Sequence, residues 1–131
     1  MPIFKFNKLV RSKLLNEYNR LGQKVVIKKL TKDEHKRQLV KKLLEEVLEI
    51  NFDEPESIKD EIADVRQALD DLAEICGISE VDIKTAQQKK FDKKGGFSEG
   101  VFVETIRLAE DDEWIEYYRK NPDRYPEKPE K

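Results

Sequence analysis

Two amphipathic stretches joined by a short loop constrain this chain more than any other feature. The first ends near Leu48 and repeats apolar side chains such as Leu43 and Val47 at helical spacing. The second covers about residues 58–75 and stops before Gly77. Because a short connection favours antiparallel neighbours, the sequence predicts a helical hairpin.

Capping residues indicate where these two helices begin. Thr31 followed by Glu34 forms a capping box, which opens the first helix. In the loop NFDEPES we expect Pro55 to lie outside the helix and Ser57 to cap the second one.

Shorter elements are expected around the hairpin. A helix is predicted over about residues 12–21, and another over about residues 80–94, capped by Ser79 and ended by Gly95 and Gly96. Short extended segments are expected near the N-terminus and after residue 96. The predicted fold class is therefore mainly α.

The length of 131 residues suits one compact domain. We expect this domain over residues 1–108 and a C-terminal helix and proline-rich arm over residues 109–131, because the composition shifts after Leu108. Aromatic side chains of the arm are expected to dock on the domain or on a partner subunit; they are Trp114, Tyr117, Tyr118 and Tyr125.

Charge is strongly segregated along the chain, although the net charge is only −2. Residues 1–44 carry 13 basic and three acidic side chains, whereas residues 45–82 carry 14 acidic and two basic ones. Alternating blocks of this kind can concentrate cations and anions at one site. Solvated helix faces are the alternative interpretation.

Carboxylates recur at helical spacing on both helices of the predicted hairpin: Glu45, Glu46, Glu49, Glu61 and Asp64. At about 100° per residue, Glu46 flanks the apolar stripe and Glu61 falls within the apolar face of its helix. A buried carboxylate costs several kcal/mol unless it is paired or bound to a metal. Because Lys59 and Arg66 are the only cations over residues 45–82, we expect a bound ion, Mg²⁺ first and Mn²⁺ second.

Three separated motifs carry a family resemblance. The pattern EExxE at residues 45–49, followed by ExxD at residues 61–64, resembles the metal motif of the all-α nucleoside triphosphate pyrophosphatases, the MazG superfamily. FNKLVRSK at residues 6–13 and KKGGF at residues 93–97 resemble its phosphoribosyl-ATP pyrophosphohydrolase-like branch. The match covers about residues 4–103.

This resemblance implies a Mg²⁺-dependent hydrolase that splits a nucleotide between its α and β phosphates, releasing a nucleoside monophosphate and pyrophosphate. It implies a MazG-like helical bundle completed by oligomerisation, as a homodimer or homotetramer. The implied metal ligands are Glu46, Glu49, Glu61 and Asp64. The implied phosphate-binding residues are Lys8, Arg11, Lys13, Lys90, Lys93 and Lys94. Ser12 departs from the family pattern, in which Asp is frequent.

The sequence offers no protein nucleophile for such a hydrolysis. It contains no P-loop, His35 is the single histidine, and Cys76 is expected to be a small core residue. Metal-activated water is therefore the expected nucleophile, with Glu45 or Glu49 as the catalytic general base.

Two alternative functions stay open at this point. One is hydrolysis of phosphoribosyl-ATP in histidine biosynthesis, and the other is a non-enzymatic helical interaction module that uses the basic N-terminal block. We expect a nucleotide substrate, no nucleic acid or membrane partner, and a cytoplasmic location. The location is expected because no apolar run approaches the roughly 18 residues of a membrane span and no signal-peptide pattern is present.

Overall fold

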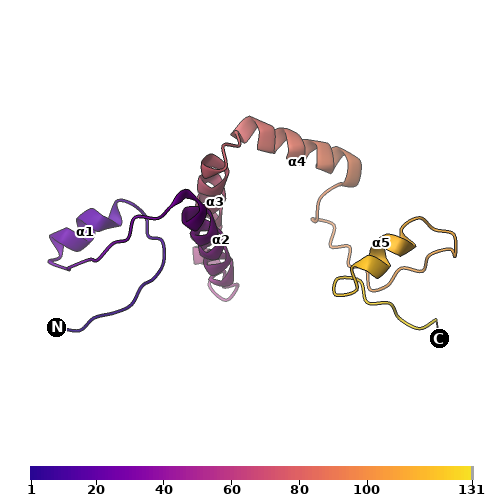
Figure 1. Cartoon of the computed structure of the whole chain (residues 1–131), viewed down its shortest axis with the longest axis horizontal. Helices are drawn as coiled ribbons and strands as arrows, with labels where there is room; N and C mark the ends of the chain where they lie inside the picture. Colours follow the sequence, from indigo (N-terminus) through magenta and orange to yellow (C-terminus); the bar gives the residue numbers. More distant parts are fainter. Residues whose placement is uncertain (131) are drawn as a thin grey trace. The chain divides into compact units, whose positions relative to one another are not determined.

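The computed structural model describes residues 1–130, so the last position of the predicted C-terminal arm lies outside the described residues. It contains the helices α1 (Leu14–Arg20), α2 (Lys32–Leu48), α3 (Pro55–Ile75), α4 (Glu80–Lys94) and α5 (Ile115–Lys120) (Figure 1). No strand forms within the described range. The mainly α class is therefore confirmed, whereas the MazG-like bundle and its oligomerisation stay predictions.

The described chain divides into two compact units, one over Met1–Lys94 and one that begins at Gly95. The domain expected over residues 1–108 and the extension expected after it stay predictions. Within residues 1–130, no helix has the length and apolar character needed to cross a membrane.

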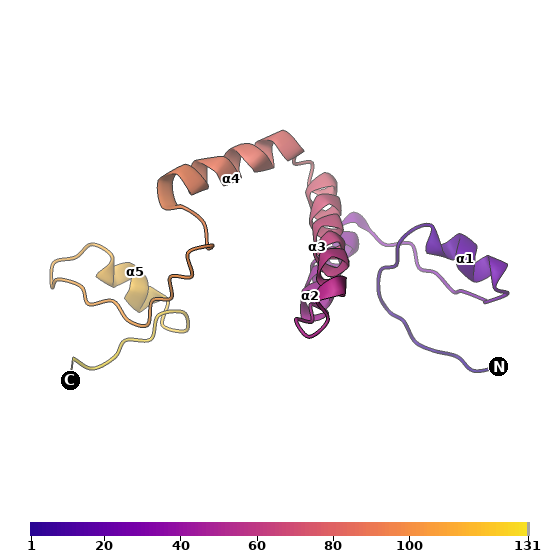
Figure 2. The ribbon, with the colours of Figure 1, turned by 180° about the vertical axis from the view of Figure 1, so that it is seen from behind.

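The first unit is built on the packing of α2 against α3. The two helices run side by side as an antiparallel hairpin, which is visible from both directions (Figures 1 and 2). Leu39 of α2 and Ala68 of α3 are the buried apolar side chains of the seam between them. Burial of apolar surface along this seam therefore holds the hairpin together.

The start of α2 follows the predicted capping box. The Thr31 hydroxyl accepts a hydrogen bond from the Glu34 backbone N–H (3.2 Å), and the Glu34 carboxylate accepts one from the Thr31 N–H (3.1 Å). A hydrogen bond from Lys28 (2.7 Å), together with those from Thr31, lowers the pKa of Glu34 to about 2. The cap thus carries a carboxylate that stays ionised over most of the pH range.

The start of α3 differs from the expectation. Pro55 is the first helical residue, a position where its missing N–H and its fixed φ cost nothing. Ser57 lies inside the first turn, where its hydroxyl donates to the Glu54 carbonyl oxygen at 2.9 Å. The predictions that Pro55 lies in the loop and that Ser57 caps the helix were therefore wrong.

The shorter elements agree in part with the sequence. α4 spans the predicted residues, with Ser79 Oγ accepting the Asp82 N–H at 3.1 Å and Gly95 at a φ of 77° after its last turn. α1 is shorter than predicted at both ends. The segments expected to be extended form no strand within the described residues.

The hairpin also exposes an apolar face that is distinct from its seam. Exposed apolar residues recur at helical spacing on both helices, and we call this set the apolar face: Val40, Leu44, Val47, Ile62 and Leu69. At about 100° per residue, these positions fall on one side of each helix, and antiparallel packing brings the two stripes to the same side of the hairpin. Cys76, at the end of α3, is exposed, so its expected place in a core was wrong.

In the second unit, aromatic rings pack against one another around α5. The rings belong to Trp114, Tyr117, Tyr118 and Tyr125, with centroids of contacting pairs 4.7 to 6.3 Å apart. The Arg124 guanidinium lies 5.2 Å from the Tyr125 ring centroid, and Arg119 Nε donates to Glu127 at 2.6 Å. The expected docking of these aromatic residues onto another surface stays a prediction.

Candidate functional site

The helical spacing places most of the predicted carboxylates on the side of the hairpin opposite the apolar face. We call this side the acidic side; it is formed by Glu45 of α2, by Glu49 at the C-cap of α2 and by Asp64 of α3. Glu46 lies next to it in the seam, where its exposed fraction is 8%. The inward position expected for Glu46 is confirmed.

Lys42 links two of these carboxylates. Its Nζ lies 3.3 Å from Glu45 Oε2 and 3.2 Å from Glu46 Oε1. Desolvation lowers the pKa of Lys42, but the hydrogen bonds to Glu46 and Glu45 outweigh it, so the pKa is raised above its usual value. Sequence reasoning missed Lys42 because it counted cations only from residue 45 onward, although spacings of three and four residues predict these contacts.

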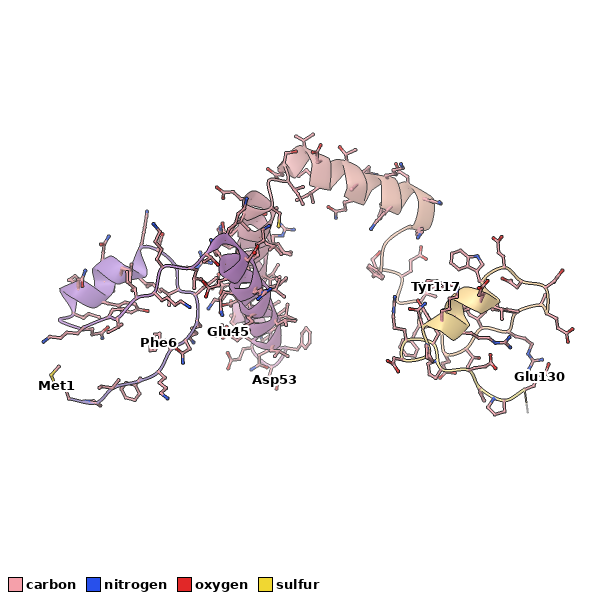
Figure 3. All side chains as sticks on the ribbon, viewed as in Figure 1. Met1, Phe6, Glu45, Asp53, Tyr117 and Glu130 are labelled. Carbon is pink, nitrogen blue, oxygen red and sulfur yellow. The ribbon has the colours of Figure 1, made fainter. Side chains whose placement is uncertain are left out.

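The N-terminal segment, residues 1–13, supplies two more cations to the acidic side. Lys8 Nζ lies 3.2 Å from Glu45 Oε1, and Arg11 Nη2 lies 2.6 Å from Asp64 Oδ1. Figure 3 marks Glu45 on α2, where Lys8 contacts it. The structure thus brings two predicted phosphate-binding residues into direct contact with two predicted site carboxylates.

Glu61 is stabilised by hydrogen bonds from the start of the hairpin loop and of α3. Its Oε2 accepts the Asn51 N–H at 2.9 Å, and its Oε1 accepts the Ser57 hydroxyl at 3.1 Å. The carboxylate is half-buried, as expected from its position among the apolar residues of the sequence pattern of its helix. Its burial is therefore compensated by neutral donors of the same chain.

The electrostatic surroundings of Glu45 and Glu49 push their pKa values in opposite directions. Desolvation raises the pKa of Glu45, but hydrogen bonds from Lys8 and Lys42 outweigh it and bring the pKa below its usual value. The pKa of Glu49 is raised, chiefly by repulsion from the Glu46 carboxylate and then by desolvation. These two carboxylates, one in the last turn of α2 and one at its C-cap, thus have different tendencies to hold a proton.

Other predicted phosphate-binding residues do not join this arrangement. Lys13 is exposed just before α1, and no ion pair forms at it within residues 1–130. Lys90, Lys93 and Lys94 are exposed on α4, and over the same range none of them contacts a hairpin carboxylate as an ion pair.

The donor chemistry fits Mg²⁺, because every predicted ligand offers carboxylate oxygens. However, no group of three or more Asp, Glu, His or Cys side chains is placed to hold a metal ion in the described part of the chain. Instead, Arg11 donates a hydrogen bond to Asp64, and Asn51 and Ser57 donate hydrogen bonds to Glu61. The expected close cluster of four carboxylates is therefore absent from residues 1–130 in this arrangement.

Comparisons with protein-family models, curated proteins and solved structures gave no match for this chain. The family resemblance rests on the motifs of the sequence alone.

Proposed function

We propose that this chain is a Mg²⁺-dependent nucleotide pyrophosphohydrolase, which cleaves an NTP-like substrate between its α and β phosphates. The products are a nucleoside monophosphate and pyrophosphate. The supporting observation is the contact of Lys8 with Glu45 and of Arg11 with Asp64. Positive side chains beside the carboxylates that bind the metal would stabilise the charge that develops during hydrolysis of a polyphosphate, and these contacts provide that neighbourhood.

The proposed ligands of Mg²⁺, or of Mn²⁺, are the oxygens of Glu46, Glu49, Glu61 and Asp64. When bound, the metal supplies Lewis acidity, which polarises a phosphate and lowers the pKa of a water molecule. Arg11 contacts one oxygen of Asp64, Oδ1, and if the metal were to take that oxygen, the guanidinium would become available to a phosphate oxygen.

Glu49 is the general base that we favour over Glu45. Glu45 is held by two lysines, whereas Glu49 is exposed, with no ion pair among the described residues. Glu49 could bind the metal through one oxygen and accept a proton from water through the other, whereas both oxygens of Glu45 are paired with ammonium groups.

Basic residues from two parts of the chain are proposed to neutralise the polyphosphate. Lys8, Arg11 and Lys13 come from the N-terminal segment. Lys90, Lys93 and Lys94 come from the last turns of α4. Their charge would stabilise the pyrophosphate leaving group.

Self-association is part of the proposal. The apolar face of the hairpin is exposed in the single chain, and pairing of two such faces would give a four-helix arrangement. We therefore propose a homodimer, or a homotetramer built from it, in the cytoplasm, with neither membrane nor nucleic acid as partner.

A panel of nucleotides tests the proposal. Purified protein with Mg²⁺ should release pyrophosphate from at least one NTP, dNTP or phosphoribosyl-ATP, and turnover confined to phosphoribosyl-ATP would select the histidine-pathway alternative. In water labelled with heavy oxygen, the label should enter the nucleoside monophosphate, because water attacks the α phosphorus. No turnover on any nucleotide, combined with salt-sensitive binding to random DNA or RNA without metal, would replace the enzyme with an interaction module.

A further inference from the structure

A small basic hollow lies between the N-terminal segment and α2. Its volume is about 240 Å³, and we call it the basic hollow; its polar lining consists of Asn7, Lys8, Gln38, Lys41, Lys42 and Glu45. Three lysines and one glutamate line it, so the lining carries an excess of positive charge, although Lys42 also pairs with Glu46 of the seam at 3.2 Å.

We propose that the basic hollow binds the di- or triphosphate part of a nucleotide, with Lys41 and Lys42 as phosphate ligands beside Lys8. This inference deepens the proposed function and rests on it for the identity of the whole substrate. It assigns two residues that no motif indicated, together with the Gln38 side-chain amide as a neutral donor.

Glu45 currently occupies the place that a phosphate group would take. Its two carboxylate oxygens lie 3.2 Å from Lys8 Nζ and 3.3 Å from Lys42 Nζ, so the group bridges two ammonium ions. A phosphate chain offers more acceptor oxygens and more negative charge than one carboxylate, and it competes for the same donors. Binding would therefore release Glu45 from both lysines.

The burial of Lys42 strengthens the case for a ligand. Its side chain is only 24% exposed, whereas the side chain of Lys8 is 46% exposed. An ammonium group that is partly shielded from water interacts more strongly with an anion than one on the open surface. Lys42 is thus expected to contribute more to affinity than its exposed neighbours.

The size of the basic hollow favours a phosphate chain over a whole nucleotide. Pockets that enclose a drug-sized molecule span about 300 to 1,000 Å³, which exceeds the 240 Å³ of the basic hollow. The nucleoside would therefore lie outside it.

Titration calorimetry of the full chain with inorganic triphosphate, without any divalent metal, tests the site. Wild type should bind, and Lys41→Gln and Lys42→Gln should each weaken the affinity about tenfold, since each removes one charge-assisted contact. Lys36→Gln is the matched control, because Lys36 also lies on α2 but does not line the hollow. No binding by wild type, or equal binding by all three variants, would overturn the inference.

Further measurements distinguish a defect in folding, a wrong choice of ligand and a failure of the proposed function. Lys42→Arg should keep most of the affinity for triphosphate. If Lys42→Gln lowers the helical signal in circular dichroism, the result for Lys41→Gln decides, because Lys41 is exposed and its substitution should leave the helix intact. Tighter binding of a short single-stranded oligonucleotide than of triphosphate would overturn the choice of ligand. Triphosphate binding without turnover of any nucleotide would count against the proposed function alone, whereas turnover with an unchanged KM in Lys41→Gln and Lys42→Gln would count against the hollow alone.

Discussion

Arg11 and Asp64 are separated by 53 positions in the sequence, yet Arg11 Nη2 lies 2.6 Å from Asp64 Oδ1. Together with the contact between Lys8 and Glu45, this ion pair holds the N-terminal segment against the acidic side of the hairpin. The same contacts connect the two predicted halves of a metal and polyphosphate site.

Substitution of Arg11 tests whether this contact orders the N-terminal segment. Arg11→Gln should speed amide hydrogen exchange over residues 6–13, while global stability should fall by only about 0.2 to 1 kcal/mol, because the pair is exposed to solvent. Arg20→Gln is the control, since Arg20 pairs with Glu17 inside α1. Unchanged exchange over residues 6–13 in Arg11→Gln would contradict this role.

The capping box at Thr31 should contribute measurably to stability. Thr31→Ala removes the acceptor for the Glu34 N–H and should lower the free energy of unfolding by about 1 kcal/mol in urea titrations followed by circular dichroism. Thr85→Ala, at an exposed position within α4, should change it little. Equal effects of the two substitutions would show that the cap does not stabilise α2.

The depressed pKa of Glu34 predicts a specific pH dependence. Its folded-state pKa of about 2 lies below the ordinary value of 4.5, so the ionised carboxylate stabilises the folded chain above about pH 4.5. This stabilisation is lost as the pH falls from there towards 2. Glu34→Gln should therefore be less stable than wild type at pH 7 and equal to it near pH 2.

Thermal melting of both proteins between pH 7 and pH 2 measures this difference. Glu74→Gln serves as the control, because Glu74 is exposed on α3 and its carboxylate takes part in no capping hydrogen bond among the described residues. If the difference in melting temperature between wild type and Glu34→Gln were constant over this range, the ionised Glu34 carboxylate would not be the source of that difference.

The apolar face should control self-association. Wild type should elute as a dimer or tetramer in size-exclusion chromatography with light scattering, and Leu44→Lys should shift it to the monomer, because a charge in that interface would lose its hydration. Val81→Lys on α4 is the control for an added lysine at an exposed apolar position. A monomeric wild type would refute the proposed assembly.

Local patterns were enough to predict the hairpin but not all of its ends. The spacing of Leu39 and Leu43 and the Thr31 cap are properties of neighbouring residues, and the structure has α2 as expected. The start of α3 was misplaced because Pro55 was treated as a helix breaker, although the first helical position accepts proline.

The partners of the carboxylates could not be predicted from helix periodicity. Glu61 and Asp64 were expected to lack compensating partners, but the Asn51 N–H donates to Glu61, and Arg11 reaches Asp64 from a distant part of the sequence. Only the tertiary arrangement of the N-terminal segment reveals the second contact. The resemblance placed Lys8 and Arg11 at phosphates, whereas the structure pairs them with the carboxylates of Glu45 and Asp64.

Pyrophosphate release by Glu61→Gln tests the proposed metal-dependent hydrolysis most directly. Gln keeps an oxygen acceptor for the Asn51 N–H but lacks the charge for a metal ligand, so helical content should be retained while kcat with Mg²⁺ falls about a hundredfold. Glu74→Gln, on the outer side of the same helix, should keep the wild-type rate. Full activity of Glu61→Gln would contradict the proposal.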